Sequence, residues 1–129
     1  MALEEELPKQ KFILGDQEFS YEDLIDEIKH WFLYSSYAHI DYEALPRKCQ
    51  KLEVIETIED SLSYEDTWHI LTEGVAGDYI EEFWSEYEKL TDKIWEKVKD
   101  DPKRGFISIT WDTPDFVAYA IVIVECVKD

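Results

Sequence analysis

Two carboxylate and histidine pairs in this chain have a spacing that can build a metal site. Glu27 and His30 are three residues apart, as are Asp66 and His69, and di-iron bundles bind metal with this arrangement on a helix. The helix expected around the first pair has its apolar face centred near Ile28. At about 100° per residue, His30 then points roughly 160° away from that face, towards solvent. We therefore expect surface histidines and no metal site.

Cysteine and glycine patterns add no catalytic signature. Cys49 and Cys126 are not at Cys-x-x-Cys spacing, so a mixed zinc site has no support and we expect two buried cysteines. Two cysteines also do not make a disulfide framework. The Gly74 to Gly77 loop follows an expected helix, and the acids around it argue against a phosphate cradle. We predict no catalytic residue and no cofactor.

Charge is the strongest feature of the sequence. The 129 residues include 31 acidic and 13 basic side chains, which gives a formal net charge of -18. Between Lys51 and Lys89 there are twelve carboxylates and no lysine or arginine. Such a surface attracts cations and repels phosphate, so we expect no direct binding to nucleic acid or to anionic membranes. The favoured partner is a basic protein.

Composition favours one folded domain. Hydrophobic residues make up 45% and aromatic residues 15% of the chain, whereas disordered acidic tails are poor in both. We expect residues 1–129 to form a single acidic α+β domain, with residues 1–9 as a flexible N-terminal arm. The N-terminus lacks the pattern of a secretory signal, and no apolar run approaches the roughly twenty residues of a membrane helix. A cytoplasmic location is the default expectation.

Hydrophobic periodicity and turn residues predict the elements. Ser20 and Asp23 form a capping-box-like pattern at the start of a helix. Apolar residues at three- and four-residue steps indicate further helices, and alternation or β-branched runs indicate strands. The expected helices cover Ser20 to about Ser35 and residues 46–61, 63–74 and 78–99; the expected strands cover residues 11–14, 17–19, 106–111 and 117–126.

These elements predict an α+β fold. Residues 117–126 are apolar on both faces, which is typical of a central strand covered on each side. We place this strand between residues 106–111 and residues 11–14. The expected architecture has about four helices packed on a small, mainly antiparallel sheet of three or four strands, formed by the N-terminal segment and a C-terminal hairpin.

Part of the acidic density has an ordinary cause, because carboxylates in the first turn of a helix interact favourably with its dipole. Other acids lack this explanation, and a solvated, solubilising face is the alternative interpretation for them. Tyrosines and carboxylates also occur together in the segment that links the first two expected helices, a composition common at recognition surfaces. The predicted partner-binding residues are Tyr34, Tyr37, Asp41, Tyr42, Glu43, Glu53, Glu56, Glu59, Asp60 and Glu73.

Three functions follow in order of preference. The first is a small binding protein that sequesters or inhibits a basic protein, as an immunity protein, an antitoxin or a nucleic-acid mimic would. The second is an interaction or scaffold subunit of a larger assembly with no inhibitory role. A small enzyme that uses carboxylates comes third. The sequence leaves the oligomeric state open.

Overall fold

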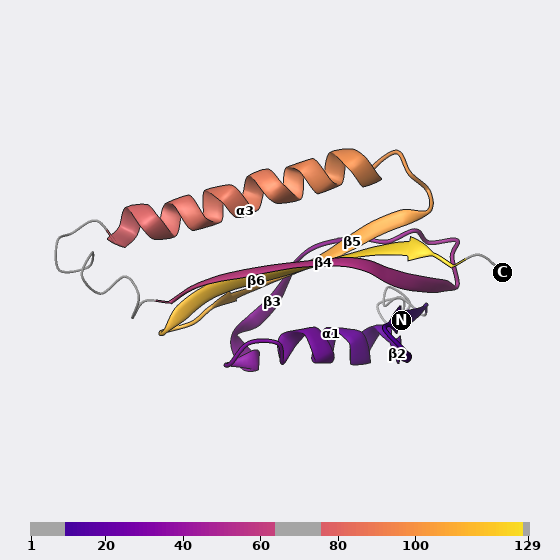
Figure 1. Cartoon of the computed structure of the whole chain (residues 1–129), viewed down its shortest axis with the longest axis horizontal. Helices are drawn as coiled ribbons and strands as arrows, with labels where there is room; N and C mark the ends of the chain where they lie inside the picture. Colours follow the sequence, from indigo (N-terminus) through magenta and orange to yellow (C-terminus); the bar gives the residue numbers. More distant parts are fainter. Residues whose placement is uncertain (1–9, 64–75, 128–129) are drawn as a thin grey trace, which may run out of the picture.

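The computed structural model describes residues 10–63 and 76–127, and it places one α-helix on each face of a six-stranded sheet (Figure 1). The strand order is β2-β1-β4-β6-β5-β3, and β1 pairs with β4 in parallel while the other neighbours are antiparallel. The elements are β1 (Lys11–Leu14), β2 (Gln17–Ser20), α1 (Tyr21–Lys29), the 3-10 helix η2 (Ser35–Tyr37), β3 (Ala38–Ala44), β4 (Lys51–Ser63), α3 (Ala76–Val98), β5 (Arg104–Asp112) and β6 (Phe116–Cys126).

The N-terminal hairpin and the start of α1 follow local sequence signals. Gly15 has a φ of 64° in the turn between β1 and β2, a conformation that glycine adopts without steric cost. The Ser20 hydroxyl caps α1 by accepting a hydrogen bond of 3.2 Å from the Asp23 amide. The expected strands and the cap are therefore confirmed. The helix is shorter than expected, because the chain leaves α1 at His30 and turns through Tyr34 into η2 and β3.

β6 is a central strand, as the sequence predicts, and its two faces build two separate cores. One set of its side chains packs in the core on the α1 side of the sheet, and the alternate set packs in the core on the α3 side. The first set is Ala118, Ala120, Val122 and Val124, and the second is Tyr119, Ile121 and the partly buried Ile123. The sheet thus separates the two helices.

The expected arrangement of about four helices on three or four strands is wrong. Residues 46–61 were expected to be helical, but most of this range belongs to the 13-residue strand β4, which lies between β1 and β6. Its even-numbered apolar residues Leu52, Val54, Ile58 and Leu62 fit a strand as well as a helix, and sheet pairing on both sides decides between them. The strand 11–14 is therefore one position further from β6 than expected.

Two other expectations fall outside the described residues, namely most of the helix at residues 63–74 and the flexible arm at residues 1–9. In the part of the chain that the structure describes, no helix is both long enough and apolar enough to cross a membrane.

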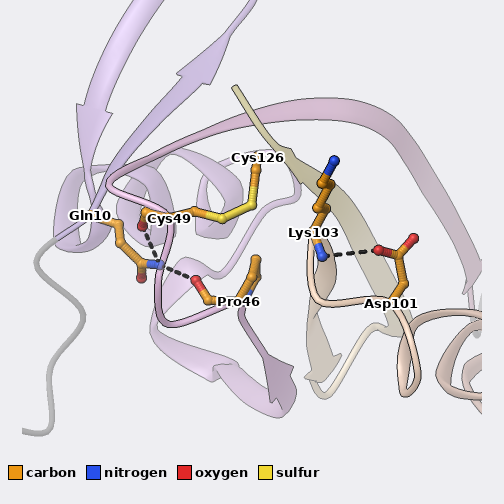
Figure 2. Close-up of a disulfide and its surroundings, with 6 residues drawn as sticks. All are labelled: Gln10, Pro46, Cys49, Asp101, Lys103 and Cys126. Atoms are coloured by element: carbon orange, nitrogen blue, oxygen red, sulfur yellow. Dashed lines mark hydrogen bonds between the residues drawn. A yellow bond between two sulfur atoms is a disulfide. The ribbon is translucent and has the colours of Figure 1, made fainter. Parts of the chain in front are cut away.

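Cys49 and Cys126 are joined by a disulfide, a pairing that the sequence left open (Figure 2). Their Cα atoms are 5.7 Å apart, and both residues are only half-buried, so the expectation of buried cysteines is wrong. Leu52 near the start of β4 pairs with Cys126 at the end of β6. This antiparallel pairing brings Cys49, in the loop before β4, close to Cys126. The pairing of two distant strands creates this contact, which cysteine spacing alone does not specify.

Candidate binding surface

β3 lies at one edge of the sheet, and its middle residues are exposed. It pairs with β5 on one side, and no described strand pairs with its other side. A bulge between Ile40 and Tyr42 leaves Asp41 without a register partner on β5 and reverses the alternation of the side chains that follow. Tyr42 then lies opposite Ser108, on the face of the sheet that α3 covers. The bulge therefore directs Asp41 and Tyr42 towards α3.

Two exposed tyrosines precede this edge strand. Tyr34 and Tyr37 are 45% and 41% exposed, and their rings meet edge to face with centroids 5.9 Å apart. Tyr34 has a φ of 62° at the start of η2. Its hydroxyl donates a hydrogen bond of 2.5 Å to Oδ2 of Asp115, a residue of the turn between β5 and β6. This hydrogen bond fixes the pair beside β3, so the two rings present a defined surface to solvent.

A buried tyrosine of α3 anchors Asp41. The Tyr87 hydroxyl donates to Asp41 Oδ2 at 2.6 Å and also contacts the hydroxyl of the fully buried Ser108. Burial, assisted by Asp41, raises the pKa of Tyr87 well above its ordinary value, while the Ser108 hydroxyl opposes this shift. Because a general base should have a pKa near the working pH, Tyr87 is poorly suited to that role. The cluster instead fixes β3 against α3.

A cavity of about 260 Å³ opens beside this anchor, between the edge strand and the C-terminal half of α3. Its buried wall is the ring of Phe106, which is 2% exposed, and its outer walls include Tyr42 and Trp95, which are 43% and 46% exposed. The lining residues are Tyr42, Glu43, Ala44, Thr91, Asp92, Trp95 and Phe106. We name this site the α3–β3 cavity. Three of these lining residues are aromatic, and none is basic.

Carboxylates surround the phenol of Tyr42 at the cavity. Partial burial and then the charges of Asp41, Glu88 and Asp92 raise the pKa of Tyr42, and a hydrogen bond with Thr91 opposes this shift. Only the first of these carboxylates was among the predicted site residues. The surface around Tyr42 is therefore more acidic than the sequence prediction for this segment implied.

The contributions of α3 to this surface were missed because its aromatic residues were assigned to an apolar stripe. Tyr87 and Thr91 are buried, but Trp95 is 46% exposed. The three residues are four positions apart, so they follow one another along one side of the helix. This four-residue spacing, at the margin of the apolar stripe, was the sequence signal that could have placed Trp95 at the surface.

The predicted acidic residues of β4 do not join the tyrosine segment. Glu53, Glu56, Glu59 and Asp60 are all exposed, but they lie on β4, which β6 and β5 separate from β3. Three strand spacings of about 4.8 Å place the two groups about 14 Å apart. The sequence placed these acids on a helix, whereas the strand puts Glu59 and Asp60 on opposite faces of the sheet. Glu73 lies outside the described residues.

Acidic groups flank α3 on both sides. Towards β3 these are the carboxylates around Tyr42, and towards β4 they are Asp60 and Glu86. Burial and then the charges of Asp60 and Glu86 raise the pKa of Tyr119, which places both carboxylates near this phenol. We name the α3 side of the molecule the acidic face. Of the predicted acidic residues, Asp41 thus lies at one margin of this face and Asp60 at the other, so they do not form one compact site.

The described residues offer no arrangement for a metal ion. No group of three or more His, Cys, Asp or Glu side chains among them is placed to hold one. His30 is exposed, and its Nδ1 lies 2.7 Å from the backbone oxygen of Asp26, within its own helix. The other carboxylate and histidine pair, Asp66 and His69, lies outside the described residues.

Comparisons with known proteins give no relative for this chain: no protein-family model, no curated protein and no solved structure matches it.

Proposed function

We propose that this protein binds a basic protein through its acidic face and the exposed edge at β3, and so sequesters or inhibits that partner. An immunity protein, an antitoxin or a nucleic-acid mimic would act in this way. The single observation that carries the proposal is the side-by-side placement of half-exposed aromatic rings, Tyr42 and Trp95, and the carboxylates of Asp41, Glu88 and Asp92. No basic side chain lines the cavity between them.

The carboxylates and the aromatic rings of this surface contribute differently to binding. The excess of carboxylates over basic side chains steers a cationic partner and raises its association rate by about 10 to 1,000-fold. Exposed aromatic rings supply contact area at low entropic cost, and such residues dominate the affinity of many interfaces. Tyr34, Tyr37 and Ile40 are also exposed near this edge, but Ile40 lies opposite Ile109, on the face of the sheet that α1 covers. Charge without these rings would support only diffuse attraction.

Affinity capture from a lysate of the source cells, with two charge-matched variants, tests the proposal. Asp41→Asn/Asp92→Asn neutralises two carboxylates at the surface, and Asp26→Asn/Glu27→Gln neutralises two exposed carboxylates on α1, on the other side of the sheet. Both changes raise the formal net charge from -18 by two. We expect the first variant to retain basic proteins about 10-fold less well, and the second to match the wild type.

Salt gives the second readout of this capture experiment. Retention by the wild type should be strong at about 0.1 M salt and weak at about 1 M, because the Debye length falls from about 10 Å to about 3 Å. Equal losses in the two variants would mean that attraction is diffuse and that the surface has no special role. Retention that is the same at both salt concentrations would contradict the electrostatic basis of the proposal.

The outer side of β3 supports a second candidate, an interaction or scaffold subunit with no inhibitory role. None of the described strands pairs with that side, and Ile40 and Tyr42 of this strand are exposed on opposite faces of the sheet. An unpaired edge can add a strand from another chain. This function predicts self-association or a partner that stays bound at high salt in the same capture experiment. A protein that remains monomeric and releases its partner in high salt contradicts it.

The cytoplasmic location stays a proposal, and the disulfide provides its test. Disulfides persist mainly in oxidising compartments and are rare in the cytosol. If the protein works in the cytoplasm, Cys49 and Cys126 should be recovered from source cells as thiols when lysis is done with an alkylating reagent. Recovery of the intact disulfide would contradict a cytoplasmic location.

A further inference from the structure

The α3–β3 cavity combines three properties that together restrict its ligand. Its lining includes the buried ring of Phe106, the half-exposed rings of Tyr42 and Trp95, and the exposed carboxylate of Asp92. Tyr42 also packs near Tyr87 and Phe106, with ring centroids 6.5 Å and 6.4 Å away. The cavity is therefore an aromatic site with a negative charge at its margin.

Asp92 is the carboxylate available to a ligand here. Glu43 also lines the cavity, but its carboxylate accepts a hydrogen bond from Tyr21, which belongs to the core on the α1 side of the sheet. The carboxylate of Asp41 is held by Tyr87. Within the described residues no ion pair involves Asp92, and its charge contributes to the raised pKa of Tyr42. A ligand of this cavity would meet a carboxylate without a cationic partner.

These properties favour a planar organic cation. An anion would be repelled by the surrounding carboxylates, and an apolar ligand would desolvate Asp92 without giving it a partner. A guanidinium stacks on aromatic rings, is weakly hydrated and presents paired donors to a carboxylate. An ammonium is more strongly hydrated and has no flat face to stack between two rings.

We propose that the α3–β3 cavity binds the guanidinium group of an arginine side chain that the basic partner supplies. The source of the arginine rests on the proposed function, whereas binding of the guanidinium rests on the cavity alone. Arginine would stack against Trp95 and Tyr42 and pair with Asp92. The cavity would thus be the point of the acidic face that selects one side chain of the partner.

Nuclear magnetic resonance titration of the full chain tests this proposal with defined probes. Nα-acetyl-arginine amide is compared with the neutral isostere Nα-acetyl-citrulline amide and with Nα-acetyl-lysine amide. The readout is the indole N–H signal of Trp95, assigned from the spectrum of Trp95→Phe. We expect a saturable shift with arginine and a dissociation constant on the order of 1–10 mM. Citrulline and lysine should bind at least about 10-fold more weakly.

Two single variants locate the binding group. Asp92→Asn should weaken arginine binding to the level of citrulline, and Asp26→Asn on α1 makes the same chemical change far from the cavity and should leave it unchanged. Thermal unfolding of both variants checks that the fold is retained. Equal binding of arginine and citrulline, equal binding of lysine, equal losses in the two variants, or no saturable shift of Trp95 would each overturn the proposal.

The titration and the capture experiment test the cavity proposal and the proposed function independently of each other. If arginine does not bind but basic proteins are still retained in a salt-sensitive way that depends on Asp41 and Asp92, the cavity proposal is wrong and the proposed function stands. If arginine binds in the cavity but no basic protein is retained, the guanidinium site stands and the sequestering function is wrong.

Discussion

Loss of the Cys49–Cys126 disulfide is expected to lower the free energy of unfolding by about 4–5 kcal/mol. The two residues are 77 positions apart, and a crosslink across so long a loop removes much conformational entropy from the unfolded chain. The bond also lies where three strands begin or end. It joins the loop before β4 to the end of β6, and the Gln10 side chain next to β1 donates to the backbone oxygens of Pro46 and Cys49 at 2.6 Å and 2.8 Å (Figure 2).

Denaturant unfolding of three samples measures this effect. The oxidised wild type should be the most stable, and the reduced wild type and Cys49→Ala/Cys126→Ala should both be less stable by a similar amount. Reductant should not change the stability of the double variant, which serves as the control. Thiol titration of the unfolded, unreduced wild type should find no free cysteine. Two free thiols in that sample, or equal stability with and without reductant, would contradict the prediction.

The sequence predicted the elements whose signals are local. Gly15 in a turn and the Ser20 hydroxyl as a helix cap need only their neighbours in the chain, and both are as expected. The apolar run 117–126 also identified β6 as a central strand. In each case one short segment contains the physical cause of the structure.

β4 could not be predicted in this way because its apolar residues fit a helix as well as a strand. Its register shifts between Val54 and Glu56, so the even-numbered apolar residues face α1 before the bulge and α3 after it. Ile55 at the bulge is 44% exposed, although its spacing from Leu52 and Ile58 fits a helix. Pairing with β1 and β6 determines the strand, and those partners are distant in sequence.

The candidate surface was predictable only in its local half. Tyrosine and carboxylate composition predicted a surface at residues 34–43, and these residues are largely exposed in the structure. The α3–β3 cavity depends on a second bulge, at Asp41, and on the packing of a helix that begins more than thirty residues later. Neither the direction of Tyr42 nor its contact with α3 follows from residues near it in the chain.

Stability is expected to fall steeply above pH 10 because of two buried tyrosines. Burial, strengthened by Glu43, raises the pKa of Tyr21, and burial, strengthened by Asp41, raises the pKa of Tyr87. In the unfolded chain both phenols lose their protons near pH 10, while the folded protein retains them at higher pH. The unfolded state therefore binds fewer protons above pH 10, and the stability that these groups contribute is fully present below that pH and is lost above it.

The magnitude follows from proton linkage. Each phenol should lower the free energy of unfolding by about 1.4 kcal/mol per pH unit, so the pair should remove about 5 kcal/mol between pH 10 and pH 12. Tyr87→Phe should cost about 1–2 kcal/mol at pH 7, because Asp41 and Ser108 lose a hydrogen-bond partner. Above pH 10 this variant should lose stability more slowly than the wild type, since it has one phenol fewer to ionise on unfolding.

Urea unfolding at pH 7, 10, 11 and 12 measures the effect, followed by far-ultraviolet circular dichroism because ionised tyrosine quenches tryptophan fluorescence. The stability of Tyr87→Phe relative to wild type should rise by about 1.4 kcal/mol for each pH unit above 10, so the variant should become the more stable protein by pH 12. Tyr21→Phe should show the same change, and the double variant should show the sum, because the two residues belong to different cores on opposite faces of the sheet. Parallel pH profiles for wild type and both single variants would mean that neither phenol retains its proton on folding.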